Sequence, residues 1–233
     1  NLPGAIALPQ DIRQHYEHYF HTNTTRGQLM AEMFHRRAMD YQPQKVVHDP
    51  GAWALDLGCG SGASLQVISQ RYSQVVGLDP ELYTLILAHK NLSEKGIQNV
   101  QLVQAYGQHI PFEANTFDYV SALNVLEHVF ELDQSAAEIY RTLRPGGRFV
   151  ADSRNRFDLF FKEPHTKLRW VGMLPRKWAP RYVRWRAGIE YNHTYLLSFF
   201  DLPRESSLLC VDLLRARTWL LMCRWTCRKH IPY

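Results

Sequence analysis

A chain of 233 residues with 45% hydrophobic side chains can form one large domain, or one domain with a smaller appendage. Its net charge of +5 permits acidic substrates, nucleic acid or a membrane surface as partners and selects none of them. The apolar stretches are too short to cross a bilayer, and four cysteines are too few for a disulfide scaffold of this size. We therefore expect a cytoplasmic protein.

The first fifty residues predict a helical cap. Residues 11–19 and 26–40 are predicted helices, the second with apolar side chains recurring at helical spacing. Residues 42–51, QPQKVVHDPG, are typical of a turn-rich linker. We expect residues 1–50 to form an N-terminal helical cap that precedes the main sheet.

Residues 51–153 alternate short apolar segments with helical ones. This alternation predicts an α/β fold with a parallel sheet covered on both faces. Such a sheet binds ligands beyond the carboxyl ends of its strands. The sequences HIPFEANTFD and RPGG are expected to be turns. The predicted strands are 53–57, 74–78, 100–105, 119–122 and 148–152, and the predicted helices are 64–71, 81–95 and 135–143.

The composition changes after the last of these strands. Residues 154–186 contain ten basic and two acidic side chains, with seven aromatic residues interleaved, and we expect them to form a lid over the active-site face. Residues 191–200 predict a further strand, and residues 205–228 a basic amphipathic helix. The segment 154–233 is therefore expected to supply the lid and complete the same domain.

A glycine-rich loop follows the first predicted strand. Residues 58–63, GCGSGA, fit the pattern G-x-G-x-x-A, and Asp79 ends the next predicted strand. The glycines permit a tight turn and close approach of a ligand, and the acid can accept hydrogen bonds from a ribose diol. Since the loop lies between a strand and a helix, the pattern predicts a nucleotide-type ligand rather than a plain turn.

Asp56, two residues before the loop, favours one class of nucleotide. A carboxylate at this point repels a pyrophosphate, whereas the sulfonium and ammonium groups of S-adenosyl-L-methionine (SAM) attract it. The alternative is that Asp56 braces the loop or caps the helix that follows. We expect a cationic nucleoside, with its ammonium near Asp56 and its ribose on Asp79.

Four segments resemble the successive motifs of class I SAM-dependent methyltransferases: ALDLGCGSG, VVGLDP, IPFEANTFDYVSALNVLEHV and RTLRPGGRFV. The resemblance covers residues 52–152. It implies a Rossmann-like sheet of seven strands, parallel except for the last, flanked by helices, and a reaction that leaves S-adenosyl-L-homocysteine (SAH). By this resemblance, the cofactor contacts are Asp56, Gly58 and Gly60 for the methionine part, Asp79 for the ribose, Pro80 beside the adenine, and Leu123 and Asn124 through their backbone.

One position departs from the family pattern. Relatives often have GDAxxLPF where this chain has AYGQHIPF, so Tyr106 stands where an adenine-reading aspartate is usual. Either Tyr106 stacks on or bonds to the base, or the backbone groups of Gly107 and Gln108 read it.

No family-wide catalytic residue can be identified from these motifs, because methyl transfer depends on positioning and needs a base only for an acceptor of high pKa. The candidate bases are His128, in LEHV, and His165, which has Glu163 two residues away. Asn155 and Arg156 follow the last strand of the core and are candidate substrate contacts with Glu163.

The lid resembles those of methyltransferases that act on small molecules, sugars or secondary metabolites, so the expected reaction is O- or N-methylation of a small molecule. A basic, aromatic lid also suits RNA, and the basic C-terminal segment suits peripheral membrane contact or a lipid-linked acceptor. We do not expect nucleic acid, because no RNA-binding module accompanies the lid. An inactive partner subunit and an NAD-dependent oxidoreductase are the remaining alternatives.

The C-terminal sequence CRWTCRKH, residues 223–230, contains Cys-x3-Cys-x2-His. Radical SAM enzymes use three cysteines at similar spacing, but here the third position is histidine and a fourth ligand is missing. We expect ordinary thiols and no metal site. The oligomeric state does not follow from the sequence.

Overall fold

The fold was analysed in a computed structural model of the chain. The residues that the structure describes are 51–129, 131–154, 156–157, 166–175, 177–191, 196–197 and 222–229. The predicted N-terminal helices at 11–19 and 26–40 lie outside them.

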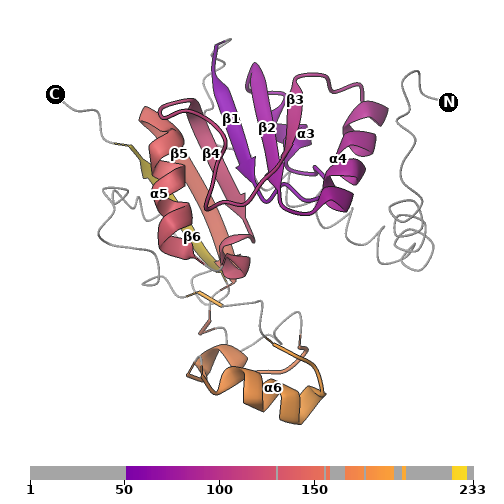
Figure 1. Cartoon of the computed structure of the whole chain (residues 1–233), viewed down its shortest axis with the longest axis vertical. Helices are drawn as coiled ribbons and strands as arrows, with labels where there is room; N and C mark the ends of the chain where they lie inside the picture. The colour runs from indigo at the N-terminus through magenta and orange to yellow at the C-terminus, as the bar shows by residue number, and fades with distance from the viewer. Residues whose placement is uncertain are drawn as a thin grey trace.

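The described residues build one six-stranded sheet (Figure 1). The order across the sheet is β3-β2-β1-β4-β5-β6, and the first five strands are parallel while β6 runs antiparallel to β5. The chain moves outward from β1 to β3 and returns to place β4 beside β1, so the order reverses between these two strands. The strands are β1 (Trp53–Leu57), β2 (Gln74–Asp79), β3 (Val100–Gln104), β4 (Phe117–Leu123), β5 (Leu143–Arg154) and β6 (Met222–Arg228).

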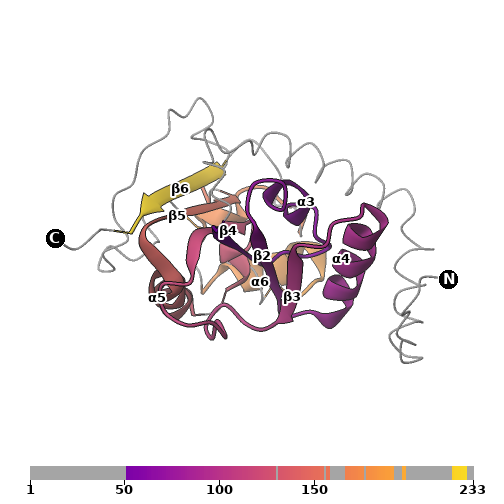
Figure 2. The same ribbon diagram turned by 90° about the horizontal axis from the view of Figure 1, so that it is seen from above.

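Helices cover both faces of the sheet (Figure 2). One buried cluster joins alternate side chains of the central strands, such as Leu55 and Val120, to Ile139 of α5. A second buried cluster, on the opposite face of the sheet, joins the intervening side chains, such as Ala54 and Val75, to the helices α3 and α4. The helices are α3 (Leu65–Ile68), α4 (Leu82–Glu94), α5 (Leu132–Thr142) and α6 (Ala179–Ala187), with two 3-10 turns, η1 (Leu126–His128) and η2 (Val171–Met173).

The expected Rossmann-like core is confirmed, and β1 has the predicted bounds. The number of strands differs, because the described residues supply six where seven were expected. The predicted turn RPGG lies inside β5, which begins at Leu143, and not before the strand. The turn interrupts the pairing with β4, because the register moves from Phe117–Leu143 to Tyr119–Arg148 and Gly146 has φ +79°. At this point Gly146 N donates to Lys229 O over 2.8 Å, and Lys229 N donates to Gly147 O over 3.0 Å. Pairing with the far end of the chain therefore continues the strand.

The predicted C-terminal helix is wrong over its last turns. Residues 222–228 form β6, which pairs with Arg148–Arg154 of β5. Leucine and arginine at helical spacing suggested a helix, but β5 offers a free ladder of N–H and C=O groups that a strand satisfies. The rest of the segment 205–221 lies outside the described residues, as does most of the predicted strand 191–200.

Helix α6 and the turn η2 lie beyond the carboxyl ends of the parallel strands (Figure 1). They have a small core of their own, in which Val183 and Ala179 of α6 pack with Val171 and Tyr191. This is the described part of the predicted lid, and it lies on the side of the sheet where parallel strands place their ligands.

Candidate cofactor site

The loop after β1 has a backbone that only glycine adopts easily. Gly58 has φ +67° and Gly60 has φ +51°, both in the left-handed region. A Cβ on Gly58 would stand 2.3 Å from Cγ2 of Val125, so the loop passes directly under the segment that follows β4. A Cβ on Gly60 would meet nothing within 4 Å. Gly58 is thus required by packing, whereas Gly60 borders open space that a ligand can enter.

The loop is tied to the end of β2. Gly58 N and Cys59 N both donate to the carbonyl of Leu78, over 2.7 and 3.1 Å, and Gly60 N donates to Oδ2 of Asp79 over 2.9 Å. Gly62 N donates to Cys59 O over 3.0 Å. A phosphate-binding loop presents free backbone N–H groups to its anion. Here four of these groups already have protein acceptors, so the loop is poorly suited to a pyrophosphate.

Asp79 organises the same edge of the sheet. Besides Gly60 N, its carboxylate accepts hydrogen bonds from Glu81 N and from Oγ1 of Thr84, both at 2.9 Å and both on Oδ1. A carboxylate offers about four acceptor positions, so one remains on Oδ2. The predicted ribose-binding acid is therefore held rigid, with acceptor capacity left for a hydroxyl group.

Asp56 is buried and bonded to two serines. Its Oδ1 accepts a hydrogen bond from Oγ of Ser121 at 2.7 Å, and its Oδ2 accepts one from Oγ of Ser64. Burial raises the pKa of Asp56 to about 6, the two serine hydrogen bonds oppose that rise, and the negative charge of Asp79 adds to it. These contacts match the bracing alternative, because Asp56 links β4 to the residue that precedes α3. Its contact with an ammonium group stays a prediction.

The other predicted cofactor residues lie at the same edge. Gly107 is packed against the end of β1, since a Cβ there would stand 3.3 Å from Cδ2 of Leu57. Asn124 has φ +54° just after β4, and Tyr106 is 65% exposed. The structure thus brings together the ends of β1, β2, β3 and β4, which carry Asp56, Gly58, Gly60, Asp79, Pro80, Tyr106, Gly107, Gln108, Leu123 and Asn124.

The predicted acceptor residues are only partly described. His128 ends η1 and is exposed. Arg156 holds the lid, because its Nε donates to Gly172 O over 3.1 Å and its backbone N donates to Leu197 O over 2.9 Å. The predicted residues Asn155, Glu163 and His165 lie outside the described residues.

Glu127 is a residue that sequence reasoning missed. It is only 5% exposed, and its Oε2 has no hydrogen-bond partner among the residues described. Buried polar groups normally have partners, so this carboxylate oxygen has an unused capacity to accept a hydrogen bond. The signal in the sequence was an acid that follows the apolar pair Val125–Leu126 and precedes His128.

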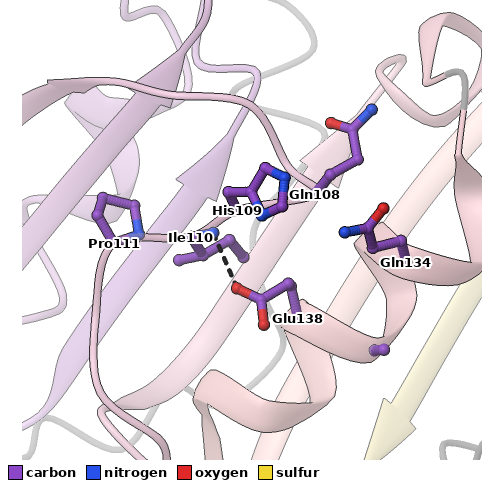
Figure 3. A pocket seen from close by; sticks show the side chains of 7 residues that line it. Gln108, His109, Ile110, Pro111, Gln134 and Glu138 are labelled. Carbon is purple, nitrogen blue, oxygen red and sulfur yellow. Dashed lines mark hydrogen bonds between the residues drawn. The ribbon is translucent and has the colours of Figure 1, made fainter.

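A separate open recess of about 400 Å³ lies between residues 108–111 and α5 (Figure 3). One wall consists of residues 108–111, and the other of Gln134, Ala137 and Glu138 of α5. Oε2 of Glu138 accepts a hydrogen bond from Ile110 N at 2.9 Å, and Arg141 binds the same carboxylate. The pKa of Glu138 is lowered mainly by its hydrogen bond from Arg141. These contacts fix residues 108–111, which continue directly from the segment 106–108 that is predicted to contact the adenine.

In the described part of the chain, no three His, Cys, Asp or Glu side chains are grouped so that they could hold a metal ion. Cys223 and Cys227 lie four residues apart in β6, which places their backbones about 13 Å apart along a strand. A single ion cannot bridge that distance. None of the described helices is both long and apolar enough to cross a membrane.

Residues 55–151 match the model of a family described as a methyltransferase domain. Sterol 24-C-methyltransferase erg6 of Schizosaccharomyces pombe is 32% identical over 126 residues, which are 53% of this chain and 33% of that protein. Demethylmenaquinone methyltransferase of Lactobacillus johnsonii is 35% identical over 109 residues, 45% of each chain. The chain therefore spans less than half the length of either relative.

Among solved structures, the crystal structure of the [4+2]-cyclase SpnF has a TM-score of 0.50 and 25% identity. The match covers 58% of this chain and 50% of that one.

Proposed function

We propose that this chain transfers a methyl group from SAM to a small-molecule acceptor, since residues 55–151 match the model of a methyltransferase domain and four of its motifs resemble those of class I SAM-dependent methyltransferases. The observation that carries the proposal is the bond from Gly60 N to Asp79, together with the loop N–H groups already bonded to β2. A rigid acid remains for a ribose, and few loop donors remain for a phosphate. That combination suits a nucleoside with positive charge.

The proposed roles follow from position. Gly58 and Gly60 let the methionine part of SAM approach the loop, and the Asp56 carboxylate, ionised above its pKa of about 6, attracts the ammonium end. Asp79 accepts the ribose hydroxyls. The adenine lies along Pro80 and the segment 106–108, where Tyr106 is exposed enough to stack on it, and the backbone of Leu123 and Asn124 borders the cofactor.

When bound, SAM supplies a methyl group attached to its sulfonium. An electron pair of the acceptor would form a bond to that methyl carbon while the carbon–sulfur bond breaks, which leaves SAH. The protein holds the acceptor in line with that group and excludes water from it. Glu127 and His128, just past β4, are proposed to face the acceptor. The free Oε2 of Glu127 can take a hydrogen bond from an acceptor hydroxyl or amine, and His128 can take the proton that the acceptor loses.

The atom that is methylated has three candidates. The lid favours oxygen or nitrogen of a small molecule, as expected from the sequence. The matched segment of the sterol relative is 32% identical to this chain, and that relative is named for methylation at carbon. Mass spectrometry and NMR of a labelled product would distinguish the three atoms.

Calorimetry with SAH and the full chain tests the proposal. We expect SAH to bind, and Asp79→Asn to weaken it about ten- to hundredfold, since a hydrogen bond to a charged acceptor is lost. The matched control is Asp118→Asn, because Asp118 accepts bonds from Trp53 N and Arg144 away from the loop. Equal affinity in both variants contradicts the site, and binding of NADH instead of SAH indicates an oxidoreductase.

Turnover is a separate measurement. An enzyme should convert SAM to SAH when a cell extract supplies acceptors, and Glu127→Gln should slow that conversion without changing the affinity for SAH. Cofactor binding with no turnover on any extract would instead indicate a partner subunit.

A further inference from the structure

Three tryptophans are exposed in one short segment of the lid. Trp170 and Trp178 are each 61% exposed and Trp185 is 77% exposed, and Met173 and Ile189 are exposed beside them. Soluble surfaces seldom present so many large apolar side chains together unless they bind something. The small core of the lid does not use these indoles, because Ala179 and Val183 supply its contacts from α6.

The exposed residues of α6 share one face. Trp178, Arg181 and Trp185 follow each other at intervals of three and four residues, which aligns them along the helix. Ala179 and Val183 are on the opposite side, where they are buried. Arg184 flanks the exposed face and forms only an exposed ion pair of 3.5 Å with Glu190. We call Trp178, Arg181, Arg184 and Trp185 the Trp–Arg face.

Positive charge is concentrated in the same segment. Residues 166–191 contain seven basic side chains and one acidic, an excess of six, whereas the whole chain has a net charge of only +5. The remainder of the chain therefore carries a net charge of −1. This segment is therefore a strongly basic part of the chain that can attract an anionic partner.

The backbone holds one indole outward at a conformational cost. Trp170 has φ +65°, a left-handed conformation that is unfavourable for a bulky residue. Strained residues of this kind persist where the surroundings fix them, and they are common at binding sites. Burial does not account for the strain, because the side chain of Trp170 is exposed.

The lid is attached at the cofactor edge of the sheet. Arg156, two residues beyond β5, bonds to Gly172 O, and a Cβ on Gly172 would stand 2.1 Å from the carbonyl oxygen of Arg156. Two backbones in such close contact keep η2 at the end of β5. A partner bound by α6 is therefore held on the side of the molecule that carries the cofactor site (Figure 1).

We propose that the Trp–Arg face docks the protein onto an anionic phospholipid membrane. Indoles favour the headgroup level of a bilayer, where the ring is apolar and its N–H meets water, and guanidinium groups pair with lipid phosphates. An exposed helix face that carries both groups suits an extended partner such as a membrane surface. Single-stranded RNA is bound instead in a groove that follows its backbone.

The test is co-sedimentation of the full chain with vesicles of phosphatidylcholine, with or without phosphatidylglycerol. We expect binding only to the anionic vesicles, weakened by salt and accompanied by a blue shift of tryptophan fluorescence. Arg181→Gln with Arg184→Gln should lower the partition coefficient roughly twentyfold, since each basic group near such a surface contributes about fivefold. Trp178→Gln with Trp185→Gln should lower it at least as much.

The matched controls are Lys95→Gln and Leu82→Gln, exposed residues of similar type on α4 or at its end. They should bind vesicles as the unaltered chain does. Equal binding by all variants, or no binding to anionic vesicles, overturns the proposal. Retention of RNA with no vesicle binding assigns the face to nucleic acid instead. SAH affinity and thermal unfolding of each variant show that the cofactor site and the fold are intact, so a failure here is distinct from a failure of the proposed function.

Discussion

The backbone N–H of Gly60 donates a hydrogen bond of 2.9 Å to Oδ2 of Asp79, which joins the loop after β1 to the end of β2. The two residues are nineteen positions apart, and each belongs to a different motif. Because this bond is made between two parts of the protein itself, it fixes the position of the loop relative to the acid. Preorganisation of this kind lowers the entropic cost of binding.

The first prediction concerns Gly60. Replacement by alanine adds a methyl group in open space, so the cost to stability is the left-handed backbone alone, about 1 kcal/mol. Gly96→Ala is the matched control, with φ +68° and equally open surroundings. Both variants should lose similar unfolding free energy in urea, but only Gly60→Ala should bind SAH more weakly. Equal SAH affinity in the two variants would remove Gly60 from the cofactor site.

The second prediction concerns the pH dependence of stability. The pKa of Asp56 is about 6 in the fold and about 4 in an unfolded chain, so the folded state holds the proton more tightly. Below about pH 4, Asp56 is protonated in both the folded and the unfolded chain, so it does not lower the free energy of unfolding. The cost of its ionisation grows between about pH 4 and pH 6, and is complete above that range at about 3 kcal/mol.

Asp56→Asn removes this dependence. Relative to the unaltered chain, the variant should gain up to about 3 kcal/mol of unfolding free energy as the pH rises from about 4 to 7. Urea titrations at the two pH values measure the change. The substitution also changes the hydrogen bonds to the two serines, but this effect is the same at both pH values. If the difference in unfolding free energy between the variant and the unaltered chain does not change with pH, the burial of an ionisable carboxyl at this position is contradicted.

The third prediction concerns Lys229, the residue after β6. Its Nζ donates to Asn115 Oδ1, Tyr140 O and Leu143 O at 2.8–2.9 Å, and it lies 4.5 Å from the centre of the Tyr140 ring. Lys229→Met leaves two carbonyls without this partner, and we expect a loss of about 2 kcal/mol in unfolding free energy. Lys95→Met, at an exposed position, should change it little. Equal losses would mean that the lysine does not fasten β6.

Local patterns were enough to identify the central sheet. The run Trp53–Leu57 is apolar except for Asp56 and is stopped by Gly58, so both ends of β1 could be predicted. The glycine spacing and the acid at the end of β2 also predicted that Gly60 and Asp79 lie at one edge of the sheet. These features depend on residues close together in the chain, or on a periodicity that repeats along it.

The errors arose where partners are distant in sequence. Residues 222–228 form β6 because β5 pairs with them. The segment RPGG lies within β5 and not before it, and there Lys229 bonds to Gly146 and Gly147. Asp56 is buried on Ser121, sixty-five residues away, so its raised pKa could not be inferred from the loop. The free oxygen of Glu127 was likewise invisible, since a missing partner has no sequence pattern.

By itself the amino-acid sequence determined the alternation of strands and helices, the glycine turn, and the acids at two neighbouring strand ends. Only the tertiary structure decided which loop N–H groups already have acceptors, how deeply each acid is buried, and which side of α6 faces outward. The physical reason is that backbone preference and periodicity act over a few residues, whereas desolvation and hydrogen-bond partnership depend on whatever the fold brings alongside.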